Sequence, residues 1–391
     1  MWSYLRYSLE LLFYFPLTYL AFLAGGWAPL LAVLAMTLTQ VLADALLPED
    51  HHDPQVRRPW ILDGMLFAHL PAGLLVLGLL AWYVTPGDPG GVRGLLASWW
   101  PGLPLHDPDA SWFDVISGGT LAGFILSGNT IVAHELVHRR GSPTRLVVGR
   151  LLLAVNGDSQ FEVAHVFGHH MHVATERDPA TARRGETLYR FVLRSTVGQY
   201  AESLALERKR LARGGHAFAS PRNIVLAGAL GTAGCGAAMF AVGAWPALAA
   251  YVFAIVYAKF MLETVNYIQH YGLVRVPGTR VEPRHSWDCM RAACTVAFYA
   301  LTRHSHHHAR PVHPFWQLHV TAALQGVSLR WGYLGAMLMA MVPPLWFRAT
   351  SPLLLQWDRQ CATADEKALV AAANRRSGLR ALSIASAADP A

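Results

Sequence analysis

Long apolar stretches, separated by short polar ones, dominate the first 270 residues of the chain. An α-helix needs about 20 apolar residues to cross the hydrocarbon core of a bilayer, and these stretches approach that length. The pattern predicts membrane-spanning helices at residues 9–24, 28–47, 61–84, 113–133, 224–242 and 247–267. A shorter stretch, residues 334–347, is broken by two prolines and is predicted to be a re-entrant or interfacial segment.

Polar segments make up the remainder of the chain. Residues 191–214 are predicted to form an amphipathic charged helix, whose basic face suits solvent, anionic lipid or an acidic protein partner. We divide the chain into a membrane-embedded domain, residues 1–360, and a C-terminal surface helix with a tail, residues 361–391. The predicted fold class is therefore all-α, a six-helix bundle in the membrane.

Composition and charge agree with a membrane protein. Apolar residues make up 53% of the chain and charged residues only 15%. The net charge of +7 comes from Arg and Lys in loops on one side of the predicted spans, as the positive-inside rule expects of cytoplasmic loops. This pattern predicts a multi-pass protein of a bacterial-type inner membrane with a cytoplasmic N-terminus. It makes membrane lipid the natural partner and gives no reason to expect nucleic acid.

The cysteines and glycines point to no redox cofactor within the chain. The four cysteines, Cys235, Cys289, Cys294 and Cys361, form no C-x-x-C pair and lack the ligand spacing of iron–sulfur clusters. No complete G-x-G-x-x-G motif is present either. We therefore expect no flavin, nicotinamide or electron-transfer cluster bound by this chain.

Nine histidines gather in four places, each just beyond apolar sequence. They are His134, His138, His165, His169, His170, His270, His304, His307 and His308. Spacings of three and four residues bring side chains to one face of a helix, so His165 and His169 are predicted to project together. His170 is rotated by roughly 100° and is predicted to serve a second metal. Because imidazole suits iron, zinc and copper, the pattern predicts a polynuclear metal site on the cytoplasmic side.

Three other interpretations were weighed against this metal site. A single histidine such as His270 on an apolar face is usually a hydrogen-bonded core residue. The His134-Glu135-x-x-His138 motif also matches zinc proteases, but such a site needs one further ligand rather than seven. A metal transporter would place its ligands at mid-membrane on facing helices, whereas these histidines lie past the helix ends.

Five segments resemble one family of enzymes. They are His-Glu-Leu-Val-His-Arg-Arg at 134–140, His165 to His170 with Val-Ala-Thr-x-x-Asp-Pro-Ala-Thr at 173–181, Gly185-Glu186-x-x-Tyr189, Asn-Tyr-Ile-Gln-His-Tyr-Gly-Leu at 266–273, and Arg-His-Ser-x-His-His at 303–308. Together they resemble the integral-membrane non-haem di-iron hydroxylases, specifically the alkane 1-monooxygenase and xylene monooxygenase group of the fatty acid desaturase-like superfamily.

The resemblance implies a di-iron enzyme. It implies two iron ions held by the nine histidines, O2 as co-substrate, and hydroxylation of a terminal methyl group on a hydrophobic molecule taken from the bilayer. The electrons are expected from a separate rubredoxin- or ferredoxin-type carrier with its NAD(P)H reductase. Fatty-acid hydroxylases and desaturases, which also use histidine-rich boxes, are the alternative.

Carboxylates are expected near these metals, because purely nitrogen ligation leaves the irons strongly cationic. The candidates are Glu135, Asp178 and Glu263. Glu135 could orient a ligand, bridge the irons, or pair with Arg139 four residues later.

The last predicted span carries polar side chains on the face of its histidine. Glu263 and Asn266 precede His270 by seven and four residues, which places all three on one face of the span. We predict that Glu263 and Asn266 support His270 from beneath. An ion pair between Lys259 and Glu263 is the alternative.

The predicted substrate is a medium-chain alkane, with a methyl-substituted arene as the alternative. Residues 173–189 resemble the alkane enzymes, whereas Gln269 and residues 343–347 resemble the xylene-type enzymes. Ala164 and His306 stand where related chains often have acidic residues. None of these departures removes one of the nine histidines.

Overall fold

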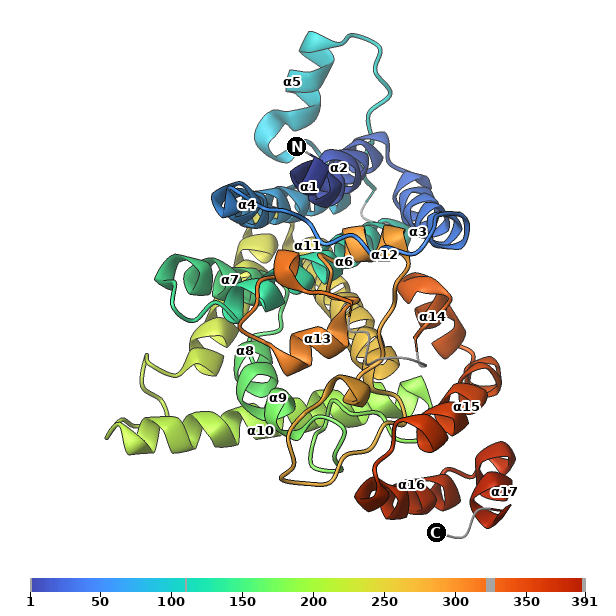
Figure 1. Cartoon of the computed structure of the whole chain (residues 1–391). Helices are drawn as coiled ribbons and strands as arrows, with labels where there is room; N and C mark the ends of the chain where they lie inside the picture. Colours follow the sequence, from blue (N-terminus) through green and yellow to red (C-terminus); the bar gives the residue numbers. More distant parts are fainter. Residues whose placement is uncertain (1, 110, 321–327, 389–391) are drawn as a thin grey trace. The chain divides into compact units, whose positions relative to one another are not determined.

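The computed structural model describes residues 2–109, 111–320 and 328–388. All regular structure among these residues is helical, apart from two isolated β-bridges, so the prediction of an all-α fold is confirmed (Figure 1). The chain divides into two compact units. The first unit comprises Met1–Thr39, Gln55–Ser159 and Ala219–Met261, and the second comprises Gln40–Pro54, Gln160–Phe218 and Leu262–Ala391.

The first unit contains most of the apolar helices. Its elements are α1 (Trp2–Leu5), η1 (Arg6–Ser8), η2 (Glu10–Tyr14), α2 (Phe15–Ala24), α4 (Pro59–Val84), η3 (Pro89–Gly91), α5 (Val92–Trp99), α6 (Trp112–Val137) and α7 (Pro143–Val155). Two further helices, α3 (Ala28–Leu46) and α11 (Ile224–His270), begin in the first unit and end in the second. Elements named η are 3-10 helices, except η2 and η4, which are π-helices.

Four of the described helices are long and apolar enough to cross a membrane: α3, α4, α6 and α11. Their positions agree with five of the six predicted spans, because α11 contains both of the last two. By length and composition, these helices are those expected of an integral membrane protein.

The first predicted span, residues 9–24, is less regular than expected. Its first part forms the π-helix η2, and the α-helix α2 follows, so the apolar helix Glu10–Ala24 is shorter than the other candidates. Pro16 at the start of α2 has no backbone N–H, so the helical hydrogen-bond ladder lacks one bond at this point.

Helix α11 turns back on itself where the two last spans were predicted to meet. Helical geometry breaks at Gly243 and Ala244, and Ala244 has a φ of +50°. The Thr232 hydroxyl donates to the carbonyl oxygen of Ala154 at 2.7 Å, and the Tyr251 hydroxyl donates to that of Val155 at 3.0 Å. Since both halves of α11 reach adjacent residues of α7, they lie side by side, which agrees with two separate predicted spans.

Helix α6 is the most buried of the candidate spans. It packs against α2, α4 and α7. Glycines on α6 also let α11 approach closely. A Cβ at Gly123 would lie only 2.7 Å from the carbonyl oxygen of Ala254 on α11, too close for any side chain. Small residues at such crossings let membrane helices approach and gain dispersion contacts. This packing fixes the helix that ends in the first histidine pair.

Most helices of the second unit are shorter than the candidate spans. Its elements are α8 (Phe161–Ala164), η4 (His165–His169), α9 (His170–His172), α10 (Leu188–Arg213), η5 (Pro283–His285), α12 (Ala292–Ala297), α13 (His304–Ala309), η6 (Phe315–Gln317), α14 (Gly332–Ala340), α15 (Pro343–Gln360), α16 (Ala364–Arg376) and α17 (Arg380–Ala388). Helix α10 confirms the helix predicted for residues 191–214. The last three residues of the predicted tail, 389–391, lie outside the described residues.

Candidate metal centre

A π-helical turn carries the second histidine group. The segment Phe161–His172 continues as α8, η4 and α9, and η4 is a π-helix that ends where the His170 N–H bonds to the His165 carbonyl. A π-turn inserts one extra residue, so side chains five apart meet instead of those four apart. His165 Nε2 and His170 Nε2 accordingly lie 3.0 Å apart.

This turn corrects the predicted pairing of these histidines. An α-helix would have joined His165 to His169 and sent His170 to the second metal. In the structure His165 and His170 belong to one group, whereas the ligand nitrogen of His169 joins another. π-turns within α-helices are frequent at functional sites.

Four buried histidines of the second unit form one compact group: His169, His270, His304 and His308. Their ligand nitrogens all lie within 4.8 Å of one another. The individual Nε2 separations are 3.0 Å for His270 to His304, 3.0 Å for His304 to His308 and 3.3 Å for His169 to His308. Three elements supply this group: η4, the end of α11, and α13.

A second group in the same unit contains His165, His170 and His307. The Nε2 of His170 lies 3.0 Å from that of His165 and 3.2 Å from that of His307. Helix α13 therefore divides its histidines: His304 and His308, four residues apart, face the first group, and His307 faces the second.

Both groups fit a bound metal ion. Ring nitrogens bound to one ion at about 2.1 Å and at right angles lie about 3 Å apart, which is the spacing found here. Burial and the neighbouring histidines lower the pKa of His308 well below its usual range, so its ring is neutral and has a lone pair to offer. Lone pairs of neutral imidazoles repel one another at this distance. Their arrangement is favourable only around a metal cation or a shared proton.

The first unit supplies a further pair at the end of α6. His134 and His138 are both buried, and their ring centroids are 4.7 Å apart. Between them Glu135 accepts hydrogen bonds from Arg139 at 2.6 and 2.8 Å, and both side chains of this pair are buried. Of the three roles predicted for Glu135, the structure therefore shows the ion pair with Arg139.

Asp178 orients one member of the four-histidine group. One carboxylate oxygen accepts from His169 Nδ1 at 2.8 Å and from the Thr181 hydroxyl at 2.6 Å, and the other accepts from the Ala180 N–H at 3.0 Å. Burial alone would raise the pKa of Asp178, but His169 and Thr181 bring it below its usual range. A carboxylate on Nδ1 directs the Nε2 lone pair of a histidine towards a metal.

Glu263 and Asn266 are buried on α11 below His270. Glu263 accepts a hydrogen bond of 2.8 Å from Gln199 on α10, and Gln199 also donates to Ser195 at 2.8 Å. Lys259 lies 3.1 Å from Asp158 in the first unit. The predicted support of His270 by Glu263 and Asn266 stays a prediction.

Two residues that fix α13 were not predicted from the sequence. Asp288 accepts from the Ser305 N–H and hydroxyl, both at 2.7 Å, which satisfies the N-terminal turn of α13. The buried Arg303 donates to the carbonyl oxygens of His52 and Leu318 and lies 3.2 Å from Asp53. The sequence offered only weak signals for these roles: Arg303 begins the segment 303–308, and Asp288 is a polar residue shortly before an apolar helix.

Two buried arginines hold the loop that follows the second histidine group. Arg275 donates to the carbonyl oxygens of Met171 and Val173, at 2.7 and 2.9 Å. Arg184 donates to the Gly272 carbonyl at 2.7 Å and binds both oxygens of Asp358 on α15. The segment after His270 is thereby fixed to the loop that contains Asp178.

Glu202 on α10 is a further residue near this site that sequence patterns did not reveal. Its carboxylate lies against Gly168 in η4, where a Cβ would come within 2.5 Å of the carboxylate oxygen. Burial raises the pKa of Glu202 to about 7, and the nearby Asp178 adds to this rise. Glu202 therefore places a weakly acidic group beside the backbone of the π-turn.

His306 points away from the histidine groups, although its neighbours are members. Its Nδ1 accepts the His319 N–H at 2.7 Å, and its ring lies 5.5 Å from that of His313 and 5.4 Å from that of His319. Burial, together with nearby histidines and arginines, lowers the pKa of His306 to about 4. Its departure from the expected acidic residue therefore leaves both groups intact.

Comparison with known proteins identifies relatives of this site. The model of the family described as "Fatty acid desaturase" matches residues 110–329, more than half of the chain. The matched region contains all nine histidines of the four histidine segments.

Individual relatives are monooxygenases by name. The chain is 31% identical over 373 residues to the xylene/toluene monooxygenase hydroxylase component XylM of Pseudomonas putida, covering 92% of this chain and 91% of the relative. It is 32% identical over 269 residues to an alkane 1-monooxygenase of Pseudomonas putida and 35% identical over 247 residues to one of Acinetobacter baylyi. These two matches cover 67% and 61% of this chain but 65% and 59% of the relatives, less than two thirds of their length.

Proposed function

The chain belongs to the fatty acid desaturase family, in the group of alkane 1-monooxygenases and xylene monooxygenase, and we propose that it is a membrane-bound di-iron monooxygenase. The observation that carries this proposal is the convergence of seven imidazoles of the second unit in two groups. Imidazole groups suit iron as well as zinc and copper, and the resemblance to the di-iron hydroxylases favours iron.

We propose one iron ligated by His169, His270, His304 and His308. The other iron is ligated by His165, His170 and His307 together with His134 and His138, whose His-Glu-x-x-His motif matches the family pattern. Bound iron supplies the reduction of O2 and the attack on an unactivated C–H bond, for which no amino-acid side chain is sufficient.

The chain's own residues hold and orient these ligands. Asp178 accepts a hydrogen bond from the Nδ1–H of His169 and so directs the Nε2 lone pair of this histidine towards the metal. Asp288 and Arg303 fix the start of α13 and with it three of the ligands. The charge of Glu135 is compensated by the ion pair with Arg139. We therefore propose that Glu135 positions its neighbours rather than ligating the metal directly. We keep Glu263 and Asn266 as supporting residues below His270.

The electrons are proposed to come from a separate rubredoxin- or ferredoxin-type carrier with its NAD(P)H reductase. A cavity of about 790 Å³ in the second unit lies beside the loop of Asp178, and its lining includes the exposed Arg177, Arg183 and Arg190. Such a positively charged surface favours association with an acidic protein. The basic loops further support an inner-membrane protein whose site faces the cytoplasm.

The proposed substrate is a medium-chain alkane, hydroxylated at its terminal methyl group. Apolar spans let a hydrocarbon that is dissolved in the bilayer approach without entering water, and the alkane 1-monooxygenases among the relatives support this choice. A methyl-substituted arene is the second candidate, because the match to XylM extends over 92% of the chain.

Competition between two hydrocarbons tests the proposal. Membranes that contain the protein, a carrier and its reductase are offered octane and p-xylene together under O2. We expect 1-octanol as the main product, with oxygen from O2, and no product from the His307→Ala variant. Predominant methylbenzyl alcohol would select the second candidate, and the absence of any oxygen-dependent product would reject the monooxygenase.

A further inference from the structure

Helix α10 exposes a short apolar stripe in its first half, although most of its buried side chains are polar. The buried side chains are Ser195, Gln199, Ser203 and Glu207 together with Leu188, Phe191 and Leu211, and the exposed end of the helix is basic. The exposed face carries Tyr189, Leu193 and Val197, which repeat every four residues and are 52%, 72% and 70% exposed. A helix in water normally shows the opposite pattern, so the outer face of α10 is built to meet an apolar surface.

The apolar surface continues from α10 onto α14 and α15. The Tyr189 hydroxyl donates to the carbonyl oxygen of Met341 at 2.7 Å, in the turn between those two helices. Around this turn, Leu338, Val342 and Leu345 are each about half exposed. Six apolar side chains of the second unit thus form one exposed surface, and surfaces of this kind mark interaction sites.

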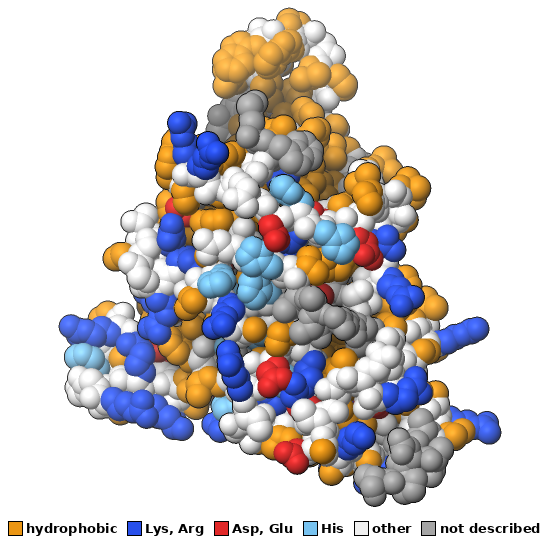
Figure 2. Space-filling model, in the orientation of Figure 1, with side chains coloured by type: hydrophobic (Ala, Val, Ile, Leu, Met, Phe, Trp, Pro, Cys, Tyr) orange, Lys and Arg blue, Asp and Glu red, His pale blue; other side chains and the backbone are white. Residues whose placement is uncertain are grey.

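Helix α15 carries this surface on to an arginine-rimmed groove. A groove of about 440 Å³ between α15 and α17 is lined mainly by apolar side chains, among them Phe347 and Leu355. Arg348, Arg359 and Arg380 also line it, and all three are exposed. Within the described part of the chain, no carboxylate forms an ion pair with any of them. In Figure 2, Lys and Arg side chains stand among hydrophobic ones along α14 to α17.

We propose that this combined surface is a membrane-contact surface, on which the groove binds an anionic phospholipid. The acyl region of the lipid contacts Phe347 and Leu355, and the guanidinium groups of Arg348, Arg359 and Arg380 bind its phosphate. The apolar stripe of α10 lies in the boundary between headgroups and acyl chains, as amphipathic helices with basic flanks do.

The candidate spans continue into the second unit, and this continuity favours the lipid bilayer as the partner of the exposed surface. The apolar helix α11 runs into the second unit and ends there at His270. Helix α3 also ends there, with Leu42 and Leu46 57% and 81% exposed. The second unit is therefore tethered to the membrane by two apolar helices. Three unpaired arginines beside an apolar groove add the charge that complements anionic headgroups, each worth roughly a fivefold preference.

Photolabelling in defined bilayers tests this inference on the complete, unaltered protein. The protein is placed in nanodiscs of phosphatidylcholine that contain a trace of either phosphatidylglycerol or phosphatidylcholine with a diazirine in the acyl chain. Labelled peptides are then identified by mass spectrometry, and the more exposed spans α3 and α11 serve as internal positive controls. We expect both probes to label α10 around Leu193, and the phosphatidylglycerol probe to label α15 at least fivefold more than its counterpart.

A matched pair of variants separates the groove from charge in general. The triple variant Arg348→Gln, Arg359→Gln, Arg380→Gln should lose the fivefold preference while α10 stays labelled. The control Arg208→Gln, Lys209→Gln, Arg213→Gln removes the same charge from the end of α10 and should keep the preference at α15.

The other possible occupants give different results. Labelling confined to the spans overturns the membrane contact, and equal labelling of α15 by both probes overturns the anionic-lipid site. Loss of the preference in 10 mM inorganic phosphate would assign the groove to free phosphate instead. Absence of lipid adducts on α10, together with pairs of chains after treatment with a bifunctional cross-linker, would assign the surface to a second copy.

Discussion

Replacing Asp178 by Asn tests how the structure holds a proposed metal ligand. The carboxylate accepts three hydrogen bonds, from His169 Nδ1, the Thr181 hydroxyl and the Ala180 N–H. An amide of the same shape has one oxygen and one NH2 group, so one oxygen site becomes a donor that faces another donor. Whichever way the amide turns, His169 loses its charged acceptor.

The expected loss of metal affinity can be estimated in two ways. Removing a carboxylate that orients a ligating histidine lowers metal affinity by about 10- to 100-fold, or roughly 1.4–2.7 kcal/mol. A hydrogen bond to a charged group contributes about 1.5–3 kcal/mol, compared with about 0.5–1.5 kcal/mol for a neutral one. Both estimates predict measurable loss of iron from one site and no loss of the fold.

Chelator titration of the iron-loaded protein provides the assay. Iron that remains bound is measured at rising chelator concentration for the wild type and for the Asp178→Asn variant, and the variant should release one of two irons at about 10- to 100-fold less chelator. Glu176→Gln is the matched control, because Glu176 is exposed and its partner Arg376 is also at the surface. Release curves that coincide for wild type and Asp178→Asn would refute the orienting role.

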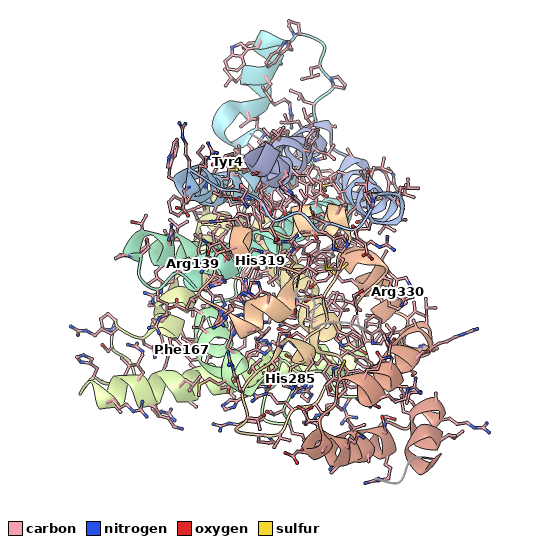
Figure 3. All side chains as sticks on the ribbon, in the orientation of Figure 1. Tyr4, Arg139, Phe167, His285, His319 and Arg330 are labelled. Carbon is pink, nitrogen blue, oxygen red and sulfur yellow. The ribbon has the colours of Figure 1, made fainter. Side chains whose placement is uncertain are left out.

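Other predictions concern α13, the C-terminal helix and the electron donor. Asp288→Asn leaves an N–H or hydroxyl of Ser305 unsatisfied, so the free energy of unfolding should fall by about 1–3 kcal/mol, measured by thermal unfolding in detergent. His285, which is labelled in Figure 3, donates a hydrogen bond of 2.9 Å to the buried Glu366 of α16. Burial raises the pKa of Glu366, but this and neighbouring hydrogen bonds have the larger effect and lower that pKa to about 2. Because that value lies below the ordinary 4.5, the pair stabilises the fold above about pH 4.5 and is lost as the pH falls towards 2. Proteolysis of α16 should therefore accelerate over this pH range in the wild type and much less in Glu366→Gln. Finally, the rate of reduction by an acidic carrier should fall as ionic strength rises from 50 to 300 mM, and NADH with the purified chain alone should give no turnover.

Local patterns were sufficient to predict the helices and the ligand types. Apolar stretches of membrane length located α3, α4 and α6 within a few residues. Such stretches are predictable because a chain inside a bilayer must satisfy its backbone hydrogen bonds within the segment, which favours a helix. The histidine spacing in α13 also predicted that His304 and His308 share a face. Both features depend on residues within a few turns of one another, which is the range over which sequence periodicity is informative.

The division of histidines between two groups could not be predicted in this way. It depends on the π-turn at His165–His169, and a shift from four- to five-residue hydrogen bonding leaves no local signature in the sequence. The residues that hold the site are also distant along the chain. Arg303 contacts Asp53, 250 residues earlier, and Arg184 contacts Asp358, 174 residues later. Such partners are fixed by tertiary packing rather than by periodicity.

The metal content of the purified protein tests the central claim most directly. Iron and other metals are measured per chain for the wild type and for His169→Ala and His307→Ala, which remove one ligand from each histidine group of the second unit. The account predicts two irons per wild-type chain and loss of metal together with hydroxylation in both variants. A single zinc per chain, without iron, would contradict it.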